Sequence, residues 1–267
     1  MYTYRYISYV ILNNSKTGVM REQPLARVRI VLVEPAGPLN VGAIARVMKN
    51  FSLHDLVLVN PQCDPRSVEA KQMAVHAVDI LEAAQLVTTL PEALLGCTRA
   101  IATTARVRTL ATQLEEPRTT LPWLLEEPKK AAALIFGPEY RGLSNEELNY
   151  AQRFVRIPSS PAYPSLNLAQ AVAICCYELS QFRQLQPSTY TTVTNEDYAS
   201  LDALEGFYQQ LEALLLKIGY LYPHTATSRM EKFRHLFNRA QLEKGEVAML
   251  RGILTQMKWA LSKRTEI

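Results

Sequence analysis

Five short apolar runs in the first two thirds of the 267-residue chain restrict the fold more than any other feature. Each run has five or six residues, is rich in Val, Ile, Leu and Ala, and shows little alternation between apolar and polar positions. Apolar residues at helical spacing mark the stretches between the runs. Strands that are buried on both faces and alternate with helices form parallel sheets covered on two sides. The sequence therefore predicts an α/β fold with strands at 28–33, 56–60, 100–104, 132–137 and 154–158.

Helix starts and helix faces are also readable in the sequence. Ile44, Met48 and Phe51 mark a first helix, residues 67–84 predict a second, and a Leu-rich piece lies near Trp123. Capping-box patterns, in which a serine is followed three residues later by a glutamate, predict further helix starts. These patterns are Ser144 with Glu147 and Ser228 with Glu231.

The composition changes along the chain suggest four parts. Residues 1–26 alternate tyrosines with polar groups, and we expect a poorly ordered tail that contributes little to a core, with Met20 as a plausible initiator. Residues 27–186 carry the α/β pattern. Residues 187–196 are polar and β-branched around a proline, which is typical of a linker. Residues 197–267 predict a C-terminal extension of three amphipathic helices that pack as a bundle or an arm.

Charge and cysteine usage narrow the classes of partner. The net charge of +4 and the pI near 8.8 allow a polyanionic partner without requiring one. The four cysteines lack C-x-x-C spacing, and Cys175 and Cys176 lie in an apolar run, so we expect packing and a reducing, cytoplasmic location. The histidines are scattered, and no apolar run has the length of a membrane span. We therefore expect no metal site and no membrane partner.

The segment 158–170 joins a loop to the start of a helix. Pro161 and Pro164 exclude helix, and Asn167 with Gln170 three residues later is typical of an N-cap that opens the apolar run after it. The first turn of a helix presents unpaired N–H groups, which suit a ligand with acceptor atoms. The same pattern is also ordinary for a helix start without a ligand, and this segment alone leaves both interpretations open.

Two other strand ends carry comparable polar loops. The segment 38–46 reads PLNVGAIAR and the segment 137–143 reads GPEYRGL. Together with PSLNLAQA at 164–171, they resemble the three motifs of the SpoU (TrmH-like) branch of the SPOUT superfamily of RNA methyltransferases, over residues 28–184. The resemblance implies a SPOUT-type parallel sheet with helices on both faces and a C-terminal deep trefoil knot. It also implies S-adenosylmethionine as cofactor and a homodimer whose active site lies at the two-fold interface.

The cofactor site follows from the resemblance by motif. The first strand is not followed by G-x-G-x-x-G, so the Rossmann-type methyltransferase pocket is absent. Glycine admits a close backbone approach, and Ile157 and Leu166 offer apolar surface to adenine. The implied cofactor-binding residues are Thr103, Thr104, Ala105, Gly137, Ile157, Ser165, Leu166 and Asn167.

The resemblance also implies residues for transfer to a ribose 2′-hydroxyl, namely Arg46, Asn40, Glu139, Ser165 and Asn167. The hydroxyl ionises far above neutral pH, so the site must accept its proton or stabilise the alkoxide. Guanidinium stays protonated in proteins, so we expect Arg46 to bind a phosphate and stabilise the alkoxide. An exposed arginine without a role, an Asn40 that acts only as N-cap and an exposed Glu139 remain the alternatives. The resemblance makes Glu139 an acceptor that positions Arg46 or Asn40.

The C-terminal run 230–261 resembles the helical extension of TrmJ-type enzymes, which methylate cytidine or uridine at position 32 of tRNA. The resemblance implies tRNA as partner. The implied RNA-binding residues are Arg46, Arg229, Lys232, Arg234 and Arg239. A charged helix face is often only solvated. Action on another tRNA position or on rRNA, or an RNA-binding protein without catalysis, remain the alternatives.

Overall fold

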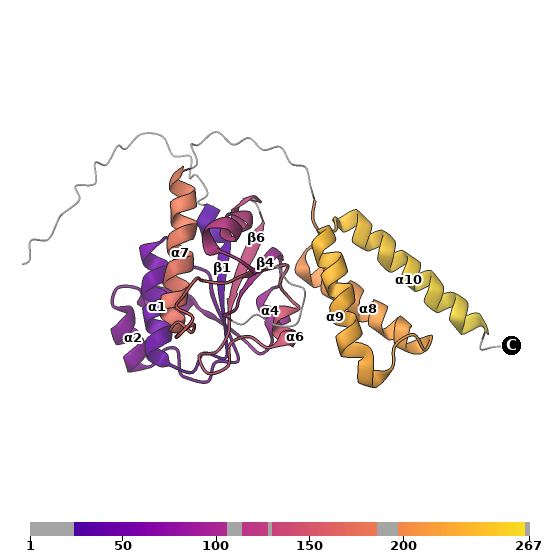
Figure 1. Ribbon diagram of the computed structural model, residues 1–267, viewed down its shortest axis with the longest axis horizontal. Coiled ribbons are helices and arrows are strands. Elements are labelled where there is room, and N and C mark those ends of the chain that lie inside the picture. Colours follow the sequence, from indigo (N-terminus) through magenta and orange to yellow (C-terminus); the bar gives the residue numbers. More distant parts are fainter. Residues whose placement is uncertain (1–23, 106–113, 128–129, 186–196, 265–267) are drawn as a thin grey trace, which may run out of the picture.

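The computed structural model describes residues 24–105, 114–127, 130–185 and 197–264. Within these ranges seven strands form one sheet in the order β3-β2-β1-β6-β4-β7-β5, and every paired ladder is parallel (Figure 1). The strands are β1 Val28–Val33, β2 Leu56–Val59, β3 Gln85–Val87, β4 Cys97–Thr103, β5 Leu114–Glu115, β6 Ala131–Phe136 and β7 Arg153–Val155. The predicted parallel α/β fold is confirmed. The tail at 1–23 and the linker at 187–196 lie outside the described residues.

All five predicted strands are present, and two further strands were not predicted. The missed strands β3 and β5 stand at the two edges of the sheet and have three and two residues. Leu86 in β3 is 49% exposed, so the strand has no buried apolar run from which it could be predicted.

The two faces of the sheet are covered by different sets of helices. Along β1, Ile30 and Leu32 belong to one core, and Val31 and Val33 belong to the other. The first core is closed by α1 Pro38–Asn50, α2 Val68–Ala74, α3 Val78–Ala83, the 3₁₀ segment η2 Leu121–Leu125 and α7 Leu168–Leu185. The second is closed by α4 Leu90–Ala93, α6 Asn145–Leu148, α8 Leu201–Lys217, α9 Pro223–Ala240 and α10 Lys244–Arg264. The short elements η1 Pro24–Arg27 and α5 Pro117–Thr120 complete the described chain.

Two helix predictions are wrong in detail. The predicted helix at 67–84 is interrupted after α2 because Val75 has φ of 56°, outside the right-handed helical region. The capping box predicted at Ser228 lies inside α9, whose start is set by Pro223 at the first helical position. The Ser228 hydroxyl instead donates to the carbonyl oxygen of Thr225 at 3.1 Å. The capping box of Ser144 is confirmed.

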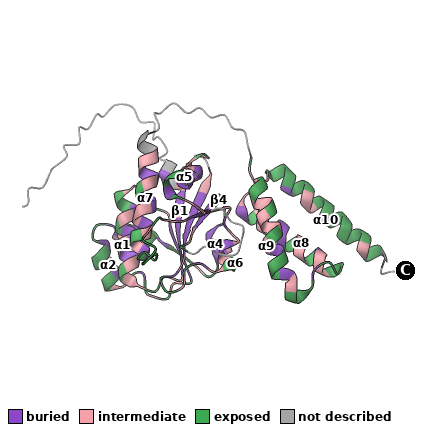
Figure 2. Ribbon diagram, in the orientation of Figure 1, coloured by how far each residue is buried: buried purple, intermediate pink, exposed green. Residues whose placement is uncertain are grey.

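Burial also differs from expectation at two places. The run that forms α7 is apolar on nearly every side, yet only one side of the helix is buried and Tyr177 is 46% exposed (Figure 2). Leu25, in the segment assigned to the tail, is 1% exposed and belongs to the first core, because η1 packs beside β1 and α7. The packing role of Cys175 and Cys176 is confirmed: both are free and buried, and burial raises the pKa of the Cys176 thiol to about 12.

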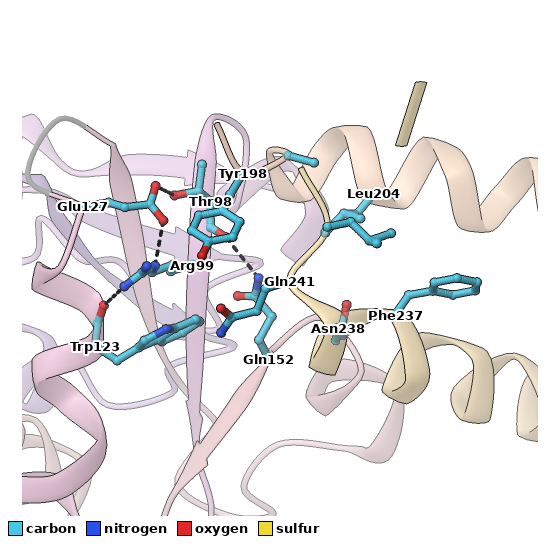
Figure 3. A pocket seen from close by; sticks show the side chains of 12 residues that line it. Thr98, Arg99, Trp123, Glu127, Gln152, Tyr198, Leu204, Phe237, Asn238 and Gln241 are labelled. Atoms are coloured by element: carbon cyan, nitrogen blue, oxygen red, sulfur yellow. Dashed lines mark hydrogen bonds and ion pairs between the residues drawn. The ribbon is translucent and has the colours of Figure 1, made fainter. Parts of the chain in front are cut away.

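The C-terminal helices pack on the second face of the sheet through apolar residues of the second core, with polar side chains beside them. Figure 3 shows Arg99 of β4 between Glu127 and Trp123, with Asn238 and Phe237 of α9 on the opposite side. The Arg99 Nε donates to Glu127 at 2.9 Å, and Asn238 Nδ2 donates to the Ala151 carbonyl at 3.4 Å. In the described part of the chain, no helix combines the length and the apolar character that crossing a membrane requires.

Candidate active site

Three polar side chains from distant segments meet at the carboxyl edge of the sheet. Asn40 lies in the first turn of α1 after β1, Glu139 lies in the loop after β6, and Asn167 immediately precedes α7. Asn167 Nδ2 donates to Asn40 Oδ1 at 3.0 Å, and Asn40 Nδ2 donates to Glu139 Oε1 at 2.8 Å. The structure therefore joins one residue of each predicted motif into a single hydrogen-bonded chain.

The N-cap role of Asn167 determines which end of its carboxamide faces Asn40. Asn167 Oδ1 accepts from the backbone N–H of Ala169 at 2.9 Å and of Gln170 at 3.4 Å, and Gln170 Oε1 accepts from the Asn167 N–H at 3.4 Å. The predicted N-cap is thus confirmed. Because the side-chain oxygen is used by the helix, the amide nitrogen is the group that is left to face Asn40.

Asn40 is not the N-cap of its own helix. The N-cap of α1 is Gly37, with Pro38 at the first helical position, so the N-cap interpretation of Asn40 is wrong. Both ends of the Asn40 carboxamide are instead used in the chain between Asn167 and Glu139. Of the two partners expected for Glu139, the structure gives it Asn40.

The Glu139 carboxylate also accepts from the backbone that leads into α1. Its oxygens accept from Ala36 N at 3.2 Å and from Gly37 N at 3.4 Å. Burial raises the pKa of Glu139, but the hydrogen bonds from Asn40 and from backbone N–H groups outweigh it and hold the pKa below its ordinary value. Glu139 is therefore an ionised acceptor near neutral pH.

Arg46 stands apart from this chain of hydrogen bonds. Its side chain is exposed, and among the residues that the structure describes it makes no hydrogen bond or ion pair. It shares the outer face of α1 with Leu39, which is 52% exposed and seven residues earlier, two helical turns away. Within one chain, Arg46 is therefore not brought to Asn167 or Glu139, and its guanidinium is free to bind a group from outside.

The loop after β6 owes its shape to its glycines. A Cβ atom at Gly137 would overlap the backbone of Gly142 and Leu143, and Gly142 itself has φ of 69°. The Gly142 N–H donates to the Pro138 carbonyl at 2.8 Å and closes the turn. Gly137 thus allows its own loop to fold back closely on itself, and this fold places Glu139 at the tip of the loop.

Arg141 was not among the predicted site residues, and it fixes the same loop. Its Nη1 and Nη2 donate to the two Glu147 oxygens at 2.8 and 2.9 Å, and Nη2 also donates to Glu34 Oε2 at 2.8 Å. Glu34 is the residue after β1 and also accepts from the Tyr140 hydroxyl at 3.0 Å. Hydrogen bonds from Arg141 and Tyr140 hold the pKa of Glu34 below its ordinary value. The available signal was an acidic residue directly after a strand and an arginine two residues after Glu139.

The residues implied for the cofactor lie at the same edge. Strands β6, β4 and β7 are neighbours, so Gly137, Thr103–Ala105 and Ile157 follow adjacent strand ends. Ile157 packs partly on the first core, and Leu166 is 36% exposed. Apolar surface beside backbone groups at the carboxyl ends of parallel strands fits a nucleoside-containing ligand. The Thr103 hydroxyl is used inside the fold, donating to the Ile135 carbonyl at 3.1 Å.

The basic residues of α9 divide between two faces. At about 100° per residue, Arg229, Lys232 and Arg239 fall within an arc of about 80°, and all three are exposed. Arg234 lies about 140° from Arg229. It pairs with both Glu205 oxygens at 2.6 and 2.9 Å, and its side chain is 15% exposed. Arg234 is thus engaged inside the chain, and we keep the RNA-contact hypothesis only for the other three.

Comparisons with known proteins give a consistent likeness. Residues 27–177 match the profile of the SpoU rRNA Methylase family, and residues 202–266 match the profile "tRNA methyltransferase TrmJ, C-terminal domain". The chain is 41% identical over 242 residues to the tRNA (cytidine/uridine/adenosine-2′-O-)-methyltransferase TrmJ of Pseudomonas aeruginosa, covering 87% of this chain and 94% of that protein. It is also 41% identical over 242 residues to the tRNA (cytidine/uridine-2′-O-)-methyltransferase TrmJ of Klebsiella pneumoniae, covering 88% and 97%. The crystal structure of TrmJ from Z. mobilis superposes with a TM-score of 0.77 at 31% identity, covering 86% and 98% of the two chains.

Proposed function

Because the chain belongs to the SpoU rRNA methylase family and carries a TrmJ C-terminal domain, we infer that it is a TrmJ-type tRNA methyltransferase acting on the ribose 2′-hydroxyl of cytidine and uridine. S-adenosylmethionine supplies the methyl group when it is bound. The observation that carries the assignment to chemistry is the hydrogen-bonded chain from Asn167 through Asn40 to Glu139, since it joins the three motif segments at one edge of the sheet.

The proposed work of this chain of hydrogen bonds is to fix the first turns of α1 and α7. The ionised Glu139 holds the entry to α1 through two backbone N–H groups, and it also fixes the Asn40 carboxamide. Asn40 in turn orients Asn167, which caps α7 beside the exposed Ser165 and Leu166. A site held in this way presents preorganised polar groups, and preorganisation is what stabilises charge that develops on an attacking oxygen.

Arg46 is proposed to act on the RNA. Its exposed, cationic guanidinium suits a phosphate beside the target ribose and the alkoxide that forms there. Because Arg46 makes no hydrogen bond or ion pair within the described part of its own chain, we propose that the enzyme is a homodimer in which Arg46 serves the site of its partner. The exposed side of α7, which includes Tyr177, supports a surface available for such a contact.

The remaining finer expectations stay proposals. The C-terminal deep trefoil knot is supported by the family and by the position of β7 between β4 and β5 in the sheet. Parts bounded at 27–186 and 197–267 are supported by profile matches at 27–177 and 202–266. The exposed basic face of α9 is proposed to contact tRNA, and a tRNA substrate together with free cysteines supports a cytoplasmic location.

Position 32 of tRNA is the proposed target, and another tRNA position is the alternative. The test is transfer of labelled methyl from S-adenosylmethionine to total tRNA that lacks 2′-O-methylation at position 32, followed by nucleoside mapping. Label in 2′-O-methylcytidine or 2′-O-methyluridine at position 32 supports the proposal. Label elsewhere keeps the reaction and rejects the position, label in adenosine widens the substrate range, and no transfer to any tRNA rejects the proposed function.

A further inference from the structure

The corner between α8 and α9 exposes an unusual group of large side chains. Ile218, Tyr220 and Tyr222 are 43%, 53% and 54% exposed, whereas Leu221 between the two tyrosines is 1% exposed. Gly219, with φ of 76°, makes the sharp turn that the corner needs. Leu221 thus packs the corner into the core, whereas the side chains of Tyr220 and Tyr222 are far less buried.

Each tyrosine ring is held in place by a neighbouring side chain. Arg229 Nη1 donates to the Tyr220 carbonyl at 3.0 Å, and the Arg229 guanidinium carbon lies 5.7 Å from the centre of the Tyr220 ring. The Tyr222 ring stacks on His224, with centroids 5.9 Å apart and an angle of 21° between the planes. The rings are therefore partly ordered before any ligand arrives, which lowers the entropic cost of stacking against them.

The corner continues directly into the basic face of α9. Arg229 contacts Tyr220, and Lys232 and Arg239 follow on the same side of the helix over about 15 Å. The side chains of Arg229, Lys232 and Arg239 are all exposed. Lys232 and Arg239 make no hydrogen bond or ion pair within the described ranges. Aromatic faces beside unpaired cations are complementary to a ligand that has both flat rings and negative charges.

We propose that this corner is a stacking platform for an unpaired nucleotide of the tRNA, with the flanking phosphates held by Arg229 and Lys232. The proposal rests on the proposed function and adds the kind of RNA element that the extension binds. Bases in a duplex are stacked and hidden, whereas loops and bulges offer free π faces to tyrosine. A protein partner would not need the row of exposed cations, so charge complementarity favours RNA.

The first experiment measures the dissociation constant for unmodified tRNA over a series of salt concentrations. The proteins to be compared are the wild type, the double alanine variant Tyr220→Ala/Tyr222→Ala, the double phenylalanine variant Tyr220→Phe/Tyr222→Phe, and Lys232→Ala. The double alanine variant is expected to bind about 5- to 160-fold more weakly with an unchanged salt slope, because stacking of one base contributes about 1–3 kcal/mol and releases no counterion. The phenylalanine variant keeps the rings and is expected to bind like the wild type. Lys232→Ala is expected to lower the salt slope by about 1. Leu86→Ala, which removes another exposed side chain, is the control.

A second measurement tests whether the bound nucleotide is unpaired. The wild type is expected to bind a stem with an open loop more tightly than a fully paired duplex of equal charge, and the double alanine variant is expected to lose that preference. The proposal would be overturned if the double alanine variant kept the wild-type affinity and the wild-type preference for the open loop. It would also be overturned if the variant changed its oligomeric mass in solution while its affinity for tRNA stayed the same, because the corner would then bind a second copy of the chain. Either result leaves the proposed function standing if the wild type still methylates tRNA, whereas absence of methylation by the wild type rejects that function.

Discussion

Asn167 and Asn40 are 127 residues apart in the chain, yet the carboxamide of Asn167 donates to the carboxamide oxygen of Asn40 at 3.0 Å. Each carboxamide is oriented by what it does at its other end. Asn167 gives its oxygen to the cap of α7, and Asn40 gives its nitrogen to Glu139. The contact therefore couples the start of α7 to the start of α1 with a fixed polarity, and a change in any of the three side chains reaches the other two.

Replacing Asn40 by aspartate tests this polarity. Asn40→Asp removes the donor to Glu139 and places two carboxylates at the 2.8 Å contact, where like charges repel. Loss of a hydrogen bond to a charged group costs about 1.5–3 kcal/mol, so we expect kcat to fall about 10- to 160-fold. Steady-state methylation of tRNA measures it. Asn50→Asp, at the exposed end of the same helix, is the control, and an equal fall in both variants would contradict the role.

The lowered pKa of Glu139 predicts an acid-dependent contribution to stability. In the unfolded chain the carboxyl group protonates near its ordinary pKa of 4.5, whereas in the folded protein it stays ionised to lower pH. Its contribution is therefore complete above about pH 5 and is lost as the pH falls through the lowered folded value. We expect the difference in free energy of unfolding between wild type and Glu139→Gln to shrink from pH 6 to pH 3.5. Glu212→Gln, on α8, is the control, and a difference that does not change with pH would contradict the prediction.

The sequence predicted the meeting of the three motifs but not the way in which they meet. Three loops that follow parallel strands must share the carboxyl edge, which is a rule of topology and needs no coordinates. That Glu139 contacts Asn40 and leaves Arg46 free depends on where the Gly137–Gly142 loop turns. That geometry follows from backbone torsions, which the residue types allow without specifying.

Arg141 offers a test of how the position of Glu139 is maintained. Arg141→Lys keeps the charge but loses the fork that binds Glu147 and Glu34 together, so the loop that carries Glu139 is expected to lose its register. We expect kcat to fall about tenfold while the affinity for tRNA is unchanged. Arg29→Lys, which breaks the pair with Asp55 at the opposite edge of the sheet, is the matched control. Equal losses of kcat in the two variants would assign Arg141 to general stability.

The basic residues of α9 differ in role because they lie on different sides of the helix. Arg234 and Arg239 look equivalent in the sequence, but their positions on the helix put Arg234 with the apolar residues that face α8. We expect Arg234→Met to lower the free energy of unfolding by about 2 kcal/mol, because it leaves Glu205 unpaired in a largely buried site. The salt slope of tRNA binding is expected to stay unchanged.

Arg239→Ala is expected to behave in the opposite way. Its side chain is exposed, so the free energy of unfolding is expected to change by less than about 0.5 kcal/mol. Loss of one phosphate contact is expected to reduce the salt slope of tRNA binding by about 1. Thermal unfolding and binding at several salt concentrations separate the two variants, and a change of slope in Arg234→Met alone would reverse the assignment of the two faces.

The exposed position of Arg46 leads to a prediction that involves two chains. If Arg46 completes the site of the partner, Arg46→Ala and Asn167→Ala each give inactive homodimers. A mixed dimer of the two variants then contains one site with both residues intact. Two-fold symmetric dimers re-formed at random from equal amounts are therefore expected to recover about one quarter of the wild-type activity. Action within one chain would leave every site without Arg46 or without Asn167, so no activity would return.

The mixed-dimer experiment also has an internal control. Binding of S-adenosylmethionine to Arg46→Ala alone is expected to equal that of the wild type, because its proposed work is on the RNA. If Arg46→Ala lost both S-adenosylmethionine binding and turnover, Arg46 would lie beside the cofactor of its own chain. Mixing Arg46→Ala with Arg46→Lys is expected to give no more than the mean of the two parents, since neither chain supplies the guanidinium. Recovery confined to the mixture with Asn167→Ala would require two chains to build one active site.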